Sequence, residues 1–392
     1  MLFRSDNADT AYSFASGGGG SPITLPAAGF AKRGSGTATF DVPVAATNGT
    51  LTVSGGTLQV IGPLGVVSTA TLSAPLVVAS NAAISFANSA TQTVSGSYSG
   101  SGTLRATNGR LKISSSGAAF SGDVVAASGV VEVATASAFL SSSANLRVEA
   151  GATMEFTALD ASGYNVANTK PIEIAGTLKV LQRDSTARGV KLFNGGSILL
   201  KGSGMDSGHA LDLFGQPTFA LVSGAASISP LDPADASQAS IIVRTEHVLK
   251  TFDVQASDAV LSVATPLIGG STANIIDKIG PGTLLWTGTN TTVAKLRASE
   301  GTFAIGGAGV LGSGASAQVI EVLAGAVFRY ASSASQTLSG AVTCSGSFAK
   351  TGGGRLSLTG AVALNAGGEL AIPGVAAAAD AVKANKIGRA HV

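Results

Sequence analysis

The sequence predicts an all-β fold, a right-handed single-stranded parallel β-helix or β-solenoid. Three features carry this prediction: a composition that must bury apolar surface, short strand patterns bounded by glycine turns, and internal repeats at an irregular spacing. Of the 392 residues, 45% are hydrophobic, only 12% are charged and 52 are glycine. A disordered chain shows the opposite balance of hydrophobicity and charge. We therefore expect a folded chain whose apolar residues are dispersed among many strands.

One sequence block occurs four times and has the common form Lys-x-Gly-x-Gly-x-apolar-x-apolar. Its copies are Phe30 to Phe40, Phe348 to Leu358, Lys278 to Trp286, and a worn copy from Arg105 to Ile113 with Thr107 at the first glycine position. Glycines supply the positive φ that tight turns require. The apolar alternation that follows them is typical of a strand with one buried face. Each copy therefore predicts a turn followed by a strand.

Two further blocks recur. Leu146 to Phe156 matches Ile320 to Tyr330, and Phe86 to Gly96 matches Tyr330 to Gly340 with Gln-Thr-Val/Leu-Ser-Gly in common. Shorter signatures of the form Gly-x-apolar-x-apolar lie between the blocks. They are Gly56 to Val60, Gly129 to Val133, Gly176 to Val180, Gly301 to Ile305 and Gly368 to Ile372. Each of them predicts one more strand directly after a turn.

Short strands in this number suit a sandwich, a propeller or a solenoid. A sandwich needs many hairpin turns, whereas Asn-Gly occurs only at Asn48-Gly49, Asn108-Gly109 and Asn194-Gly195. A propeller needs a fixed period with aromatic signatures, but the period here varies and only 5% of residues are aromatic. A solenoid accepts coils of variable length because insertions leave at the turns, so it fits best.

The segment Lys278 to Gly288, followed by Glu300 to Ile305, resembles the autotransporter-associated β-strand repeat of bacterial passenger domains and large secreted proteins. Degenerate copies extend from Phe30 to Pro373. The resemblance implies a parallel β-helix at the outer membrane, on the cell surface or in the extracellular medium. It also implies export through an outer-membrane β-barrel translocator encoded outside this chain. It implies no particular biochemical activity.

The two ends carry a different signal. Residues 387–392 back-translate as ATC GGA AGA GCA CAC GTC, and residues 1–5 back-translate as GTG CTC TTC CGA TCT. These are the two strands of a widely used sequencing-library adapter, facing inward, so we expect both ends to derive from library preparation. The expected organisation is then repeats over 6–201, an irregular excursion or loop-rich coil over 202–246, repeats over 247–373 and an Ala-rich tail over 374–386.

The segment 202–246 matches the repeat poorly and contains Pro217, Pro230 and Pro233, which are disfavoured inside a paired ladder. Its polar residues make it the place to look for chemistry. Hydrolysis of a glycosidic bond needs a paired acid and base, and the nearest candidates are Asp206, His209 and Asp212. Further candidates lie downstream, at Asp232, Asp235, Arg244, Glu246 and His247. We interpret all of these as solvated loop residues and predict no catalytic residue.

Several other classes of function lack their usual signals. The formal net charge of +2, without a basic run, argues against nucleic-acid binding. Asp232 and Asp235 are too few carboxylates for a calcium loop, and the glycine turns do not lead into a helix that would bind phosphate. The single cysteine, Cys344, excludes an internal disulfide framework, and we expect it in the core together with Trp286. We predict no metal and no cofactor.

The leading hypothesis is therefore a structural or adhesive stalk without catalysis of its own, whose partners are host or matrix surface glycans or proteins. Two alternatives remain open. One is a β-helical polysaccharide-degrading enzyme that uses the carboxylates of 202–246. The other is a phage or appendage fibre, which would share the fold and assemble as a trimer.

Overall fold

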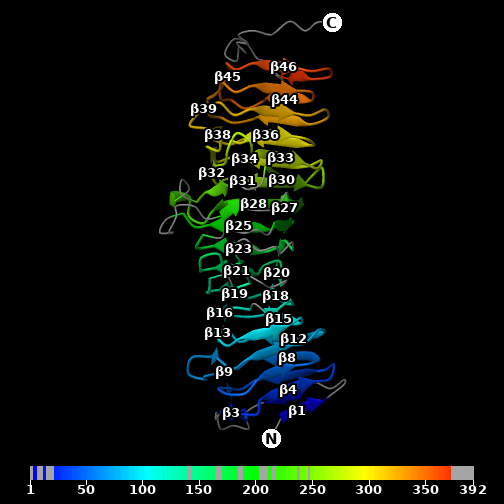
Figure 1. The fold of residues 1–392 in the computed structure, drawn as a ribbon, viewed down its shortest axis with the longest axis vertical. Coiled ribbons are helices and arrows are strands. Elements are labelled where there is room, and N and C mark those ends of the chain that lie inside the picture. Colours follow the sequence, from blue (N-terminus) through cyan, green and yellow to red (C-terminus); the bar gives the residue numbers. More distant parts are fainter. Residues whose placement is uncertain are drawn as a thin grey trace. The chain divides into compact units, whose positions relative to one another are not determined.

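The computed structural model describes residues 3–6, 12–14, 22–117, 119–136, 138–139, 144–163, 170–183, 189–202, 211–213, 218–235, 239–245 and 248–371. The chain divides into two compact units, Met1–Arg188 and Gly189–Val392. Within each unit, short strands of successive coils stack as parallel sheets (Figure 1). Over the described ranges the only helix is one 3-10 turn, η1 (Pro233–Asp235). The parallel β-helix predicted from the sequence is confirmed.

The first unit has three principal sheets, which we name after one strand of each. The β7 sheet contains β1 (Phe3–Asp6), β4 (Phe30–Arg33), β7 (Leu51–Val53), β11 (Leu76–Val78), β14 (Tyr98–Gly100) and β17 (Ala119–Phe120). The β8 sheet contains β2 (Tyr12–Phe14), β5 (Thr37–Phe40), β8 (Gly56–Val60), β12 (Ala82–Phe86), β15 (Thr103–Ala106), β18 (Asp123–Ala126), β20 (Asn145–Val148) and β22 (Ile172–Ile174). The β13 sheet contains β10 (Thr71–Leu72), β13 (Thr91–Val94), β16 (Arg110–Ile113), β19 (Val130–Val133), β21 (Thr153–Phe156) and β23 (Thr177–Val180). A small sheet joins β3 (Ile23–Thr24), β6 (Val44–Ala45) and β9 (Leu64–Gly65).

The second unit repeats this plan. The β30 sheet contains β24 (Val190–Phe193), β27 (Thr218–Ser223), β30 (Leu249–Val254), β33 (Ile275–Ile279), β36 (Lys295–Ala298), β40 (Ile320–Val322), β43 (Val342–Cys344) and β46 (Val362–Leu364). The β34 sheet contains β25 (Ser197–Leu200), β28 (Ala225–Pro230), β31 (Val260–Val263), β34 (Thr283–Trp286), β37 (Thr302–Ile305), β41 (Val327–Tyr330), β44 (Ser347–Lys350) and β47 (Glu369–Ala371). Two short sheets complete the coils. One has β26 (Leu211–Leu213), β29 (Ile241–Val243), β32 (Leu267–Gly269), β35 (Thr289–Asn290) and β38 (Val310–Leu311); the other has β39 (Ala315–Ser316), β42 (Gln336–Leu338) and β45 (Leu356–Leu358).

Every strand-to-strand ladder over the described ranges is parallel. In each ladder, a residue pairs with the residue at the corresponding position of the strand in the next coil. Thr103 pairs with Asp123 in the next coil, and Thr283 pairs with Thr302. The one antiparallel contact over the same ranges is an isolated bridge between Val66 and Thr71, at a turn between β9 and β10. Because side chains alternate between the faces of a strand, this register stacks inward residues on inward residues.

The interior of each unit is filled by these stacked rows. In the second unit an aromatic column runs through Phe252, Trp286, Phe303, Phe328 and Phe348, with successive ring centroids 6.3, 5.4, 5.5 and 5.3 Å apart. Each buried side chain of this size contributes roughly 1.5–3 kcal/mol through removal from water, and tilted ring pairs add about 0.5–1.5 kcal/mol. Trp286 and Cys344 are buried, as the sequence predicts.

The predicted repeats correspond to corners of the coil. All four strands expected after the Lys-x-Gly-x-Gly turn are present, as β5, β45, β34 and β16, and the shorter glycine signatures correspond to β8, β19, β23, β37 and β47. Within the second unit, however, two copies of the motif occupy different corners. Lys278 lies before the turn from the β30 sheet to the β34 sheet, whereas Lys350 lies before the turn from the β34 sheet to the short sheet of β39, β42 and β45. The motif therefore specifies the geometry of a turn between two sheets, and it is not tied to one position in the coil.

The segment 202–246 keeps strand positions in its described part. β27 pairs with β24 and β30, and β29 pairs with β26 and β32. Its irregular features are η1 and a register shift between Thr218 and Ala220. Pro230 is the last residue of β28, opposite Leu200, where the ladder no longer needs its missing N–H group. In the described ranges, no helix is long and apolar enough to cross a membrane.

Candidate functional site

The residues singled out from the sequence are not assembled into a site by the described structure. Asp206 and His209 lie outside the described residues, as do Glu246 and His247. Asp212 belongs to β26, where its main chain pairs with Ile242.

Of the remaining two aspartates of this segment, Asp232 is exposed and Asp235 is half-buried. Asp232 Oδ1 accepts a hydrogen bond from the main-chain N–H of Ala234 at 2.9 Å, and Asp235 ends η1. The contact of Asp232 is a local turn contact of a common kind.

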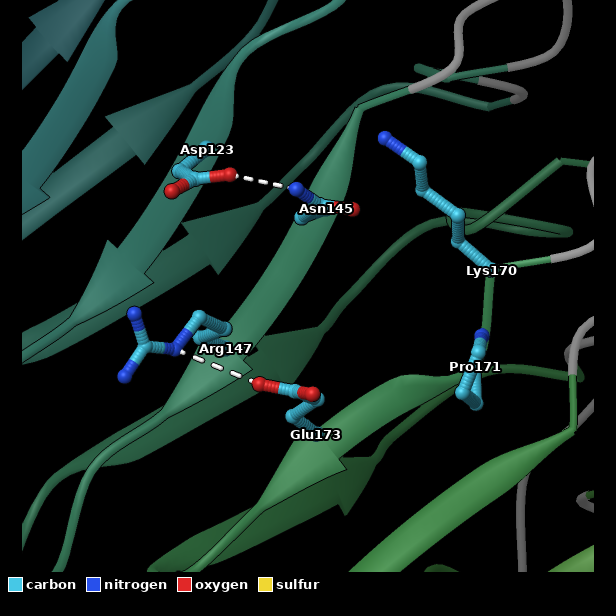
Figure 2. Close-up of a pocket in the computed structure, with 6 residues that line it drawn as sticks. All are labelled: Asp123, Asn145, Arg147, Lys170, Pro171 and Glu173. Atoms are coloured by element: carbon cyan, nitrogen blue, oxygen red, sulfur yellow. Dashed lines mark hydrogen bonds and ion pairs between the residues drawn. The ribbon is translucent and has the colours of Figure 1, made fainter.

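A polar hollow of about 380 Å³ lies instead on the outer face of the β8 sheet in the first unit. It spans three neighbouring strands, β18, β20 and β22, and the connection that leads into β22 (Figure 2). Its lining consists of charged and amide side chains and one proline ring, supplied by Asp123, Asn145, Arg147, Lys170, Pro171 and Glu173. The four strand residues occupy the outward positions of their strands, because the alternate positions are buried.

The register of the coils brings these side chains together in two pairs. Asp123 is opposite Asn145, and the Asn145 amide donates to Asp123 Oδ1 at 2.5 Å. Arg147 is opposite Glu173, and Arg147 Nε lies 3.4 Å from Glu173 Oε2. Figure 2 shows Lys170 and Pro171 on the opposite side of the hollow from the Asp123–Asn145 pair.

A further carboxylate connects the hollow to its surroundings. Glu149 Oε2 lies 3.1 Å from the guanidinium of Arg105, and Glu149 Oε1 lies 3.9 Å from that of Arg147. Arg147 is therefore held between Glu149 and Glu173. These partly exposed pairs contribute little to stability, typically 0–1 kcal/mol each, but they restrict the position of the Arg147 side chain.

The outer face of the β13 sheet carries a second group of charges that is fully committed to ion pairs. Glu155 lies 2.6 Å from Arg110 and 3.1 Å from Lys179, while Glu132 lies 2.9 Å from Arg110 and 3.0 Å from Lys112. Burial raises the pKa of Glu155, but the hydrogen bonds from Arg110 and Lys179 outweigh it and hold this pKa below its usual range. These ion pairs link neighbouring coils.

The lysines of the Lys-x-Gly-x-Gly motif point inward. Lys278 Nζ donates to the main-chain oxygens of Ile279 and Gly280, each at 2.7 Å, and of Glu300 in the next coil at 3.2 Å. Lys32 Nζ does the same with Arg33 at 2.7 Å, Gly34 at 2.8 Å and Gly55 at 3.0 Å. Each lysine therefore satisfies carbonyl groups that two successive corners leave without a strand partner.

The residue at the lysine position is bonded differently in the other two copies of the motif. Lys350 Nζ donates to the main-chain oxygen of Gly352. Arg105, at the lysine position of the worn copy, points outward and pairs with Glu149. Burial lowers the pKa of Lys32, and it lowers the pKa of Lys278 to about 8 against the opposing effect of Asp253, Glu300 and Asp277.

Two buried glutamines have an equally structural role that sequence reasoning missed. Gln336 Oε1 accepts from the N–H of Leu311 at 2.8 Å, and its Nε2 donates to the oxygens of Leu311 and Thr337, each at 3.0 Å. Gln92 makes the matching contacts with both main-chain groups of Leu64, at 3.0 and 2.9 Å. Each side-chain amide thus makes the hydrogen bonds that the main chain of a neighbouring strand would otherwise make. The Gln-Thr-Val/Leu-Ser-Gly sequence that the two blocks share is the signal from which this role could have been predicted.

The described residues contain no group of three or more His, Cys, Asp or Glu side chains placed to hold a metal ion. The hollow on the β8 sheet was also missed by sequence reasoning. Its sequence signal is one or two polar residues at the outward positions of each of three strands, and this signal can be interpreted only once the coil register is known.

Comparison of the chain with protein-family models, with curated proteins and with solved structures gave no significant match.

Proposed function

We propose that this chain is part of a passenger-type stalk protein, displayed on a bacterial cell surface or released from it, with a structural or adhesive role and no catalysis of its own. The proposal draws on the likeness of Lys278 to Gly288 to the autotransporter-associated β-strand repeat and on the parallel β-solenoid. Such a fold grows coil by coil and presents long outer faces to partners. The proposed partners are host or matrix surface glycans or proteins.

One observation carries the structural part of the proposal. The side chains that a repeat could offer for chemistry are turned into the solenoid and bonded to its main chain, as at Lys32, Lys278, Gln92 and Gln336. Because the lysine and glutamine of the repeat join neighbouring coils, the role that they support is a structural one, the stacking of coils into a long solenoid. Adhesion would then depend on the outward residues, which vary from coil to coil.

Surface display is tested in the organism that encodes the chain. Antibodies raised against the purified chain should label intact cells or detect the protein in the medium, and protease added outside the cells should remove the label. Antibodies against a cytosolic protein serve as the control and should label only lysed cells. Labelling by both antibodies only after lysis would contradict the proposal.

The same purified chain separates the other two functions. Light scattering after size exclusion would favour an appendage fibre if the chain were a stable trimer. If the chain depolymerised an acidic polysaccharide and Asp212→Ala abolished this activity, the enzyme hypothesis would be favoured over the stalk hypothesis. We expect neither result.

A further inference from the structure

We propose that the hollow formed by β18, β20 and β22 is a binding subsite for a neutral saccharide. The inference deepens the adhesive part of the proposed function and rests on it for its biological meaning, while its chemistry follows from the lining residues. Four of these residues stand on paired strands and two on the connection before β22.

The hydrogen-bonding groups of the hollow suit a polyol. A sugar hydroxyl donates and accepts at once, so it is best met by neighbouring acceptors and donors. Asp123 offers a carboxylate with more acceptor positions than its one bond with Asn145 uses, and Asn145 adds an amide carbonyl. Arg147, on the same strand as Asn145, and Lys170, on the connection before β22, add donors. Pro171 supplies an apolar ring, on which the C–H face of a sugar can rest.

The charge of the hollow selects a neutral ligand. Two carboxylates, Asp123 and Glu173, balance two cations, Arg147 and Lys170. Arg147 is in addition held between Glu149 and Glu173, so its charge is already compensated. A uronic acid or a phosphate would bring a negative charge next to these carboxylates without a free excess of positive charge.

Size and preorganisation agree with this assignment. A volume of about 380 Å³ lies near the lower end of small-molecule sites, which range over roughly 300–1,000 Å³. It would accommodate a mono- or disaccharide unit of a longer glycan. The pairs Asp123–Asn145 and Arg147–Glu173 already fix the polar groups on rigid strands, so little side-chain entropy is lost when a ligand binds.

The test is calorimetric titration of the full chain with neutral disaccharides (lactose, maltose and cellobiose) and with digalacturonate. We expect at least one neutral disaccharide to bind and digalacturonate to bind at least tenfold more weakly. Asp123→Asn and Asn145→Ala should each weaken that binding tenfold or more. Lys170→Ala changes an exposed residue outside the strands, so it should fold normally and should also weaken binding.

Glu132→Gln is the matched control, because Glu132 is an outward, ion-paired carboxylate of the same unit on a different sheet. Its binding should stay within twofold of the parent chain. The proposal is overturned if no neutral disaccharide binds, if digalacturonate binds more tightly than all of them, or if Lys170→Ala and Asn145→Ala bind as well as Glu132→Gln. Surface labelling without saccharide binding would leave the stalk in place and remove only the subsite.

Discussion

Two kinds of lysine distinguish the inside of the solenoid from its outside. Lys278 is buried, and its ammonium group bonds to three main-chain oxygens. Lys295 is partly exposed on the outer face and lies 3.4 Å from Glu321. A buried carbonyl without a donor costs about 1–3 kcal/mol, whereas a surface ion pair contributes at most about 1 kcal/mol. The inward lysines are therefore the ones on which folding depends.

Lys278→Met should lower the free energy of unfolding by about 2–4 kcal/mol, because methionine fills the space of the lysine stem but leaves the carbonyl groups of Ile279, Gly280 and Glu300 without a donor. Urea denaturation followed by circular dichroism measures the change. Lys295→Met is the control and should change it by less than about 1 kcal/mol. Equal effects of the two substitutions would show that the inward bonds are unimportant.

The pKa of Lys278 makes this difference depend on pH. Burial lowers the pKa from 10.5 to about 8 in the folded state. Between these values the unfolded chain binds more protons at this site than the folded chain, so stability from Lys278 rises with pH. The destabilisation by Lys278→Met should therefore grow by up to about 3 kcal/mol as the pH is raised from 8 to 10.5. A difference that stays constant over this range would contradict the lowered pKa.

Gln336→Glu tests the role of glutamine as a strand substitute. The new side chain keeps the length of glutamine but cannot donate, so the oxygens of Leu311 and Thr337 lose their partner and face a carboxyl group. We expect a loss of about 3–5 kcal/mol in denaturant titration. Gln255→Glu, at an exposed residue whose Nε2 lies 3.5 Å from Asp253 Oδ2, should cost less than about 1 kcal/mol. A tolerated Gln336→Glu would mean that the corner does not need these bonds.

At the scale of elements, the turns between the sheets of a coil determine the fold. They also determine how much of the fold the sequence predicts. The spacing of glycine and alternating apolar residues was sufficient to predict β5, β34 and β45. It was not sufficient to predict that Arg105 of the worn copy points outward while Lys278 points inward, because that depends on which side of the strand faces the core. Nor did it show that one motif serves different corners, which explains why the sequence period varies.

Glycine at a corner is required where two coils approach closely. Gly301 has φ of +58°, and a Cβ atom there would lie 2.5 Å from the main-chain oxygens of both Gly280 and Gly282. Gly301→Ala should therefore cost about 3 kcal/mol or more. Gly325 has φ of +79° but nothing within 4 Å of such a Cβ, so Gly325→Ala should cost only the backbone strain of about 1–2 kcal/mol. Thermal melting of the two variants measures the difference, and a reversed order would refute close stacking at Gly301.

At the scale of the molecule, the sequence predicted the fold better than the site. Parallel coils follow from local turns and strands, which are visible in any window of about ten residues. The hollow depends on the register that sets Asp123 opposite Asn145 and Arg147 opposite Glu173. These pairs are separated by connections of variable length, so no local pattern aligns them. Charged residues gather in the sequence of 202–246, but a binding site needs side chains that converge in space, and the sequence alone does not show this.

Disulfide trapping tests in-register parallel stacking most directly. Thr283 and Thr302 are opposite one another in β34 and β37, and Thr302 is opposite Val327 in β41, two coils from Thr283. Parallel neighbours lie about 4.8 Å apart and next-nearest strands about 10 Å apart, and a disulfide requires Cα atoms about 4.4–6.8 Å apart. Under mild oxidation, Thr283→Cys with Thr302→Cys should therefore link within one chain, and Thr283→Cys with Val327→Cys should not. Linking of the second pair, or no linking of the first, would contradict the coil-by-coil structure.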